Sequence, residues 1–139
     1  MNKLLNKIRH CEVCKEHLPL GPRPVIQLNE FSKIVIISQA PSRRVHASGI
    51  PWSDASGIKL RAWMNISNEI FYNPAFISIL PMGFCYPGKS VSGDLPPRPE
   101  CAPLWHSLIL ENFKSKPLIL LIGLYARTTL RTILDKRND

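Results

Sequence analysis

Four cysteines are the residues of this chain whose spacing points most directly to chemistry. Cys11 and Cys14 form a Cys-x-x-Cys pair, and Cys85 and Cys101 form a second pair sixteen residues apart. Four thiolates suit a tetrahedral zinc ion or an iron-sulfur cluster. Because zinc ribbons usually combine two Cys-x-x-Cys pairs, the uneven spacing favours a cluster, with zinc as the alternative. Buried free thiols are the alternative to any metal site.

A second candidate site is a short turn of small residues that follows an apolar run. Residues 34–37 (IVII) predict a buried strand, and residues 38–42 (SQAPS) follow it directly. The backbone N–H groups of such a turn are suited to bind a carbonyl oxygen or a developing anion. Gln39 can orient a water molecule or bind a polar ligand, but its amide is not a general base at neutral pH.

The remaining elements must bring these segments together. Apolar runs at 76–80 (FISIL) and 118–122 (LILLI) predict two more buried strands. Helices are expected at four places, with a long polar loop after the first strand: 3–9, 54–65, around 102–112 and 124–136. Short apolar strands that alternate with helices indicate an α/β fold with a parallel sheet covered on both faces. The segments that follow the three strands should therefore converge on one ligand site.

The composition is that of one globular domain. The chain has 139 residues, of which 45% are hydrophobic and 20% charged, and this argues against wholesale disorder and fibrous repeats. No apolar run reaches the roughly 18 residues that a membrane span requires. The N-terminus has no apolar segment followed by a small-residue cleavage site, so a cytoplasmic protein is expected.

An excess of basic residues favours an anionic partner. Lys and Arg number 18 against 10 Asp and Glu, which gives a net charge of +8 with His neutral. Nucleic acid is the partner expected from this balance, although excess charge also serves solubility. His46 can approach a phosphate or a base, or can be a solvated loop histidine. Basic residues near the predicted ligand loops are candidate phosphate contacts: Arg43, Arg44, Lys89, Arg98 and Arg127.

These motifs, in this order, resemble the uracil-DNA glycosylase superfamily. Residues 38–42 after the IVII strand, then 49–52 (GIPW) and 56–57 (SG), are similar to that superfamily's GEAPG turn, G-x-P-F segment and G-x-x-G segment. The cysteines resemble those of its iron-sulfur, family 4-like branch, in which four cysteines ligate a [4Fe-4S] cluster. The similarity extends from Cys11 to Cys101.

The resemblance implies a fold, a partner and an activity. The fold would be a three-layer α/β/α sandwich with a short central parallel sheet. The protein would bind DNA and hydrolyse the N-glycosidic bond of a deaminated base, uracil. The [4Fe-4S] cluster, with zinc as the alternative, would be held by the four cysteines and would brace a DNA-facing loop.

The resemblance also assigns the pocket. Trp52 lies where the family's aromatic stacks on the flipped base, with a core aromatic as the alternative. Gln39 lies where the family has Glu or Gln and would help to place water. Asp54 is the candidate that polarises the water, with capping of the next helix as its alternative. The base itself would be bound by Ala40, Pro41 and Ser42.

The sequence also departs from the family pattern. Ser38 and Ser42 replace two glycines, so a positive φ at either position would be strained. Residues 80–84 (LPMGF) carry no amide side chain where the iron-sulfur branch has an Asn that recognises the base. The chain ends at Asp139, before a last strand and a His-Pro-Ser-Pro type loop, so we expect an incomplete domain over 1–139. A non-catalytic DNA-binding remnant is the alternative function, and the unpaired sheet edge predicts a monomer prone to self-association.

Overall fold

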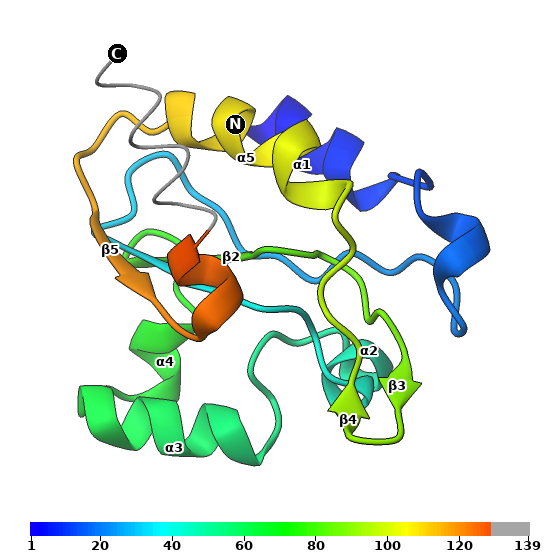
Figure 1. The fold of residues 1–139 in the computed structure, drawn as a ribbon. Helices are drawn as coiled ribbons and strands as arrows, with labels where there is room; N and C mark the ends of the chain where they lie inside the picture. Colours follow the sequence, from blue (N-terminus) through cyan, green and yellow to red (C-terminus); the bar gives the residue numbers. More distant parts are fainter. Residues whose placement is uncertain (129–139) are drawn as a thin grey trace.

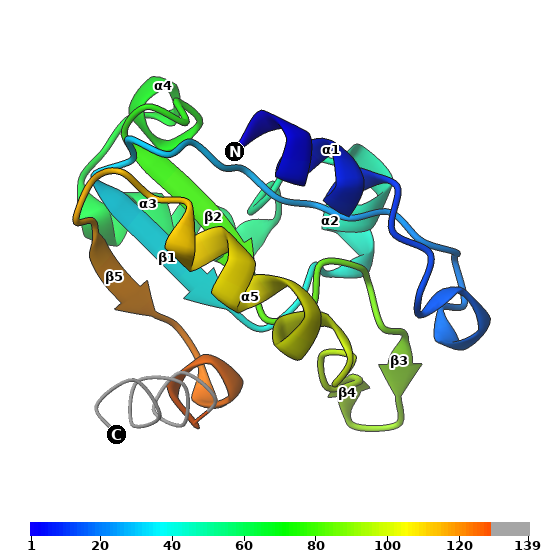
Figure 2. The same cartoon turned by 90° about the horizontal axis from the view of Figure 1, so that it is seen from above.

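A parallel sheet of three strands forms the centre of the computed structural model, which describes residues 1–128. The middle strand, β1 (Ile34–Ser38), pairs in parallel with β2 (Ile77–Pro81) on one side and with β5 (Leu118–Leu121) on the other. The three strands therefore end at a common carboxyl edge (Figure 2). Each strand predicted from the sequence is confirmed to within one residue.

Helices cover both faces of this sheet. On one face lie α1 (Asn2–Arg9) and α5 (Cys101–Glu111), and on the other lie α3 (Ala55–Met64) and α4 (Asn68–Phe71) (Figures 1 and 2). The predicted helices at 3–9, 54–65 and 102–112 are confirmed with small shifts at their ends. The fold is the expected three-layer α/β/α arrangement.

Alternation along β1 explains why the sheet has a core on each side. Val35 and Ile37 join Ile8 of α1 in one apolar cluster, whereas Ile36 joins Phe71 of α4 in the other. Successive residues of a strand point to opposite faces, so a continuous β-branched run buries both faces at once. Each of these side chains is fully buried, and burial of such a side chain contributes about 1.5–3 kcal/mol.

The prediction of a long polar loop after β1 is partly wrong, because this segment contains a short helix. In α2 (Arg43–Ser48), the Ser42 side chain accepts a hydrogen bond from the backbone N–H of Val45, and Gly49 ends the helix with a left-handed φ of 72°. A serine before the first turn and a glycine after the last are ordinary helix boundaries. The helix was missed because its polar sequence, RRVHAS, shows little apolar periodicity.

The proline-rich loop after β2 also contains structure that was not predicted. Within this loop, the strands β3 (Lys89–Ser90) and β4 (Gly93–Asp94) form a small antiparallel hairpin.

A further short element lies near the N-terminus. Residues Lys15–His17 form a single 3₁₀ turn, η1, directly after Cys14. These short elements matter because both of them lie beside candidate site residues.

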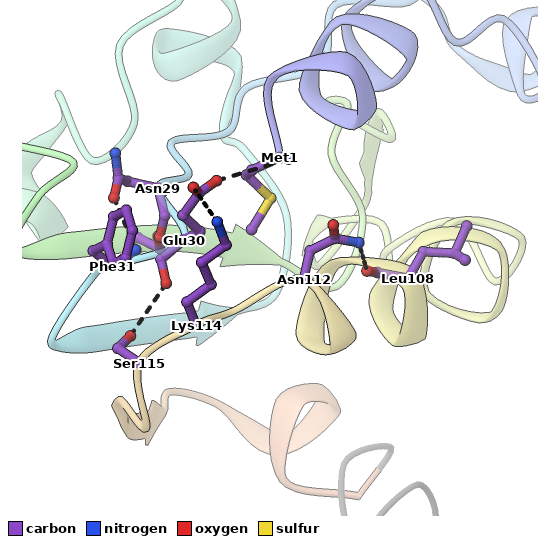
Figure 3. Close-up of polar contacts among 9 residues, drawn as sticks. Met1, Asn29, Glu30, Phe31, Leu108, Asn112, Lys114 and Ser115 are labelled. Carbon is purple, nitrogen blue, oxygen red and sulfur yellow. Dashed lines mark hydrogen bonds and ion pairs between the residues drawn. The ribbon is translucent and has the colours of Figure 1, made fainter.

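Glu30 contacts two segments that are distant in the sequence, on the far side of the sheet from its carboxyl edge. Its carboxylate lies 3.8 Å from the Met1 amino group and 3.5 Å from Lys114 Nζ. The Ser115 hydroxyl donates a hydrogen bond of 3.3 Å to the Glu30 carbonyl oxygen (Figure 3). The start of α1 and the chain that leads into β5 are thereby held beside residue 30.

The last described residues leave one prediction open. Residues 124–128 are helical, as expected, but the rest of the helix predicted at 124–136 lies outside the described residues. Within residues 1–128 the outer edge of β5 pairs with no further strand, and Leu118 is 62% exposed. No helix in this range is both long and apolar enough to cross a membrane.

Candidate functional site

A cavity of about 430 Å³ opens at the carboxyl edge of the sheet. Its wall includes Gln39 after β1, Pro81 at the end of β2 and Gly123 after β5. The predicted convergence of the segments that follow the three strands is therefore confirmed. The wall is completed by the segment before α3, by one face of α3 and by Asp94 of the hairpin. A cavity of this size is within the range of small-molecule sites.

Hydrogen bonds from the segment after β2 hold the turn after β1. The backbone N–H of Met82 donates to the Ser38 carbonyl at 2.7 Å, and that of Gly83 donates to the Gln39 carbonyl at 2.9 Å. On the other side, Gly123 has a φ of +89°, and a Cβ built on it would lie 3.0 Å from Gln39 Nε2. The chain beyond both outer strands thus fixes the turn against the cavity.

The two serines of the turn carry no left-handed strain. Ser42 has an extended backbone, with φ −73° and ψ 169°, and serves as the N-cap of α2. Among the described non-glycine residues, only Trp52 and Asn65 have a positive φ. Serine in place of the family glycines therefore costs no backbone strain in this turn, and at position 42 it adds a helix cap.

Trp52 lies in the cavity wall with a left-handed φ of 57°, a conformation that costs a residue with a side chain about 1–2 kcal/mol. Its carbonyl oxygen accepts a hydrogen bond of 2.9 Å from Arg61 Nη1. Gly57 packs so closely that a Cβ there would lie 1.7 Å from that oxygen. The ring also packs on the Ile36 and Phe71 cluster. Trp52 therefore combines the two roles that were weighed as alternatives, because it lines the cavity and also packs against the apolar core.

Asp54 also lines the cavity and at the same time caps α3. Its Oδ1 accepts a hydrogen bond of 3.1 Å from the backbone N–H of Gly57, and its Oδ2 accepts one of 2.9 Å from the Ser42 hydroxyl. The capping role is confirmed. Each carboxylate oxygen has a second lone pair, so the cap does not exhaust its capacity to accept hydrogen bonds.

The predicted base-binding residues gather at this site, whereas the predicted phosphate contacts do not line it. Ala40, Pro41 and Ser42 all belong to the cavity wall. Arg43 and Arg44 are exposed in the first turn of α2, and Lys89 is exposed on the hairpin. Their contact with phosphate stays a prediction.

His46 is neither in a loop nor fully solvated. It belongs to α2, its ring centroid lies 6.3 Å from that of Tyr86, and its Nδ1 is buried without a hydrogen-bond partner. Burial lowers the pKa of this imidazole. A neutral ring packed against Tyr86 is a weak candidate for phosphate contact, because it adds no positive charge at neutral pH.

Several residues of the cavity wall were not assigned to the site from the sequence, and those that bear a charge or a large aromatic ring are Lys59, Trp63 and Asp94. The first two lie one turn apart on α3, and Lys59 Nζ is 5.6 Å from the centroid of the Trp63 ring. Their spacing from Ser56 follows the helical period, so a helical projection that placed Ser56 toward the cavity would have found them. Asp94 reaches the cavity wall from the hairpin, which was not predicted from the sequence.

All four cysteines line a second, small cavity of about 20 Å³. Cys11 and Cys14 follow α1, Cys85 follows β2, and Cys101 is the first residue of α5. Cys11 and Cys101 are 90 residues apart in the sequence, and the fold brings all four cysteines to the wall of one cavity. That they hold a metal stays a prediction. Cavity residues other than cysteine include Leu18 and Phe84, which are both buried.

Two of the thiols are strongly shielded. Burial raises the pKa of Cys85 to about 11 and that of Cys101 to about 12. Phe84 donates its backbone N–H to the Cys101 sulfur at 3.4 Å, and the Cys14 thiol donates to Glu100 Oε2 at 3.4 Å. Within residues 1–128, no group of three or more His, Cys, Asp or Glu side chains is gathered tightly enough to hold a metal ion.

A comparison with protein families agrees with this arrangement. The family model of the uracil DNA glycosylase superfamily matches residues 25–137, which include every strand of the central sheet and all the described residues of the large cavity. The matched segment begins after Cys11 and Cys14 and includes Cys85 and Cys101. Because this match covers most of the chain and the fold is the α/β arrangement described above, this chain belongs to the uracil-DNA glycosylase superfamily.

Proposed function

We propose that this protein removes uracil from DNA by hydrolysing the N-glycosidic bond. The observation that carries the proposal is the cavity at the carboxyl edge of the sheet, where Trp52, Asp54 and the turn after β1 share one wall. An enzyme that acts on a base in DNA must hold the flipped base between an aromatic or apolar surface and hydrogen-bonding groups. This wall offers both kinds of group within one volume.

Trp52 and the turn would bind the base. The hydrogen bond from Arg61 and the contact with Gly57 fix the backbone of Trp52, so its ring is already positioned before a base arrives. The N–H groups of the turn would face the base carbonyls and stabilise negative charge on the departing base. The positive net charge of the chain favours approach to DNA.

Asp54 and Gln39 would act on water. A water oriented by Gln39 attacks C1′ of the deoxyribose, and the bond from C1′ to N1 of uracil breaks with its electron pair on the base. Asp54 accepts the proton that the water loses, and the uracil anion takes a proton from solvent. The products are free uracil and an abasic site. A positioned carboxylate contributes about 10²–10⁴-fold to such a step.

We also propose that Cys11, Cys14, Cys85 and Cys101 hold a [4Fe-4S] cluster. Four thiols around one cavity fit the ligand set of such a cluster. Zinc, which four thiolates also bind, is the alternative metal for this site. The cluster would act as a cross-link between the N-terminal segment, the chain after β2 and the start of α5.

A non-catalytic DNA-binding protein is the second candidate function. Two observations favour it: both carboxylate oxygens of Asp54 accept hydrogen bonds from the protein, and no histidine lines the cavity within residues 1–128. Such a protein would bind uracil-containing DNA and leave its glycosidic bonds intact.

One experiment separates the two functions. The protein is incubated with an oligonucleotide that contains one uracil, or thymine at the same position, and abasic sites are revealed by alkaline cleavage. If the protein is an enzyme, the strand should be cleaved only where it contains uracil. The Trp52→Ala variant should cleave it at least tenfold more slowly. Binding of the uracil oligonucleotide with no cleavage by a folded wild-type protein would overturn the catalytic proposal and support the binding protein.

A further inference from the structure

Trp63 is both exposed to solvent and part of a cavity wall. Its side chain is 77% exposed, yet it belongs to the wall of the large cavity. It lies near the end of α3 (Ala55–Met64), whereas the proposed base contacts lie near the start of that helix. Exposure of a large aromatic side chain costs free energy, so its position at the rim of a binding cavity is a reason to ask what it binds.

One face of α3 forms a continuous side of the cavity. Ser56, Lys59 and Trp63 all line it, at helical positions i, i+3 and i+7. Seven residues of α-helix extend about 10 Å along the axis. Asp54 caps the near end of this helix, so Trp63 lies about two helical turns beyond the residues that would hold the flipped base. That reach is more than the thickness of a single base requires.

Lys59 supplies a positive charge at the same place. Its Nζ lies 5.6 Å from the centroid of the Trp63 ring, within the range of a cation–π contact. An exposed indole beside an ammonium group presents a stacking surface and a phosphate ligand side by side. Proteins that bind single strands combine these same two groups, aromatic rings for bases and basic side chains for the backbone.

We propose that Trp63 and Lys59 hold the nucleotide next to the one in the cavity, with the neighbouring base stacked on Trp63 and a phosphate paired with Lys59. This inference rests on the proposed function in one respect, namely that a DNA base occupies the cavity. A base stacked on Trp63 has left its stack in the helix. Single-stranded or locally unpaired DNA meets this requirement without disruption of a duplex, so uracil in single-stranded DNA is the favoured substrate class.

Another aromatic pair provides a matched control. Phe31 is 57% exposed, and Lys114 Nζ lies 5.6 Å from the centroid of its ring. Neither residue lines the large cavity, and both belong to the cluster around Glu30 (Figure 3). Loss of an exposed aromatic ring in general can therefore be separated from loss of this particular ring.

The test measures binding to single-stranded oligonucleotides with one uracil. Fluorescence anisotropy should show that Trp63→Ala weakens binding about 5- to 150-fold, the range of one base–aromatic stack. Trp63→Phe should keep most of the affinity, and Phe31→Ala should bind like the wild type. Lys59→Gln should lower the slope of log K against log salt by about 0.7, the value for one phosphate contact on a single strand.

Two further oligonucleotides carry an abasic tetrahydrofuran on the 5′ or the 3′ side of the uracil. With the correct neighbour removed, wild type and Trp63→Ala should bind equally. The inference is overturned if Trp63→Ala binds every oligonucleotide as tightly as the wild type does. It is also overturned if Trp63→Ala loses affinity by the same factor on all of the oligonucleotides. Because this readout needs no base excision, it is distinct from the cleavage assay, and Trp52→Ala on the same oligonucleotides reports separately on the cavity.

Discussion

The Ser42 hydroxyl donates a hydrogen bond of 2.9 Å to Asp54 Oδ2, and each of these two residues is the N-cap of a helix. The turn after β1 and the start of α3 are thus joined through a single side-chain contact at the wall of the cavity. The Ser42 hydroxyl therefore caps α2 and also contacts the carboxylate that caps α3 and that is the candidate to polarise water.

Removal of this hydroxyl should affect both stability and the site. Ser42→Ala loses the cap on Val45 and the bond to Asp54, so we expect the free energy of unfolding to fall by about 1–2 kcal/mol in a urea titration. Ser67→Ala is the matched control, because Ser67 caps α4 in the same way and does not line the cavity. It should cost about 1 kcal/mol and leave binding of uracil-containing DNA unchanged. Equal effects of both variants on DNA binding would contradict a special role for Ser42.

Asp54→Asn should separate capping from chemistry. Asparagine caps helices as well as aspartate does, so the free energy of unfolding should change by less than about 1 kcal/mol. The rate of uracil release should fall by about 10²–10⁴-fold, because the amide does not accept a proton from water. Asp94→Asn removes another carboxylate from the same cavity wall and should keep most of the rate. An active Asp54→Asn enzyme would show that the carboxylate has no role in the reaction.

Gly57→Ala tests the close approach to Trp52. A Cβ would lie 1.7 Å from the Trp52 carbonyl oxygen, so the segment that carries the indole must move. We expect a loss of about 1–3 kcal/mol in unfolding free energy and weaker binding of uracil DNA. In the control Gly21→Ala, the new Cβ has no neighbour within 4 Å and only the positive φ of 78° is strained. Gly21→Ala should therefore lose about 1 kcal/mol without a change in DNA binding.

His106 should make stability depend on pH below neutrality. The ring is fully buried and donates from Nε2 to the Pro81 carbonyl at 2.8 Å, and burial lowers its pKa from the ordinary 6.5. Well above pH 6.5 the imidazole is neutral in both the folded and the unfolded protein, so it adds no pH dependence to the free energy of unfolding. As the pH falls below this value the unfolded chain gains the proton first, so stability is lost until the folded-state pKa is reached.

The measurement is urea unfolding at pH 7.5 and at pH 5.5. Carboxylates also titrate toward the lower pH, so His106→Gln, which keeps a donor for the Pro81 carbonyl, supplies the reference. The wild type should lose more stability than this variant between the two pH values, by up to about 1.4 kcal/mol per pH unit. A His10→Gln variant, altered at an exposed histidine, should follow the wild type.

The cysteine cavity is tested by anaerobic purification. A [4Fe-4S] cluster predicts a brown protein with absorption near 400 nm and about four irons per chain. Cys85→Ala should lose the colour, whereas Ser92→Ala in the hairpin should keep it. A colourless wild type that contains one zinc would instead favour the alternative metal, and a protein without metal would contradict both.

The strands were predictable because their signal is local and redundant. A run such as IVII at 34–37 is too apolar to be exposed on either side, so it predicts both a strand and its burial in the middle of a covered sheet. The helix α2 was not predictable in the same way, because Val45 is its only buried residue and its stability depends on the caps at Ser42 and Gly49. The fold class can be predicted from the pattern of apolar residues. A short helix such as α2 depends instead on hydrogen bonds at its caps, which the apolar pattern does not reveal.

The candidate site divides along similar lines. The turn at 38–42, Trp52 and the four cysteines were found from residue type and spacing. Lys59 and Trp63 were not, because their place in the cavity depends on the rotation of α3 about its axis, and the sequence shows weak amphipathicity there. Asp54 illustrates a further limit, since helix capping and a place in the cavity were weighed as alternatives and the structure combines them.

The strand order β2-β1-β5 has a consequence for how the protein is made on the ribosome. β1 is synthesised first but ends in the middle of the sheet, and its second partner arrives only with residues 118–121. Gly123, which closes the cavity against Gln39, emerges later still. Such long-range pairing is slow to form, and a nascent chain exposes its apolar strands in the meantime. The binding cavity is therefore completed only after residue 123 has emerged from the ribosome.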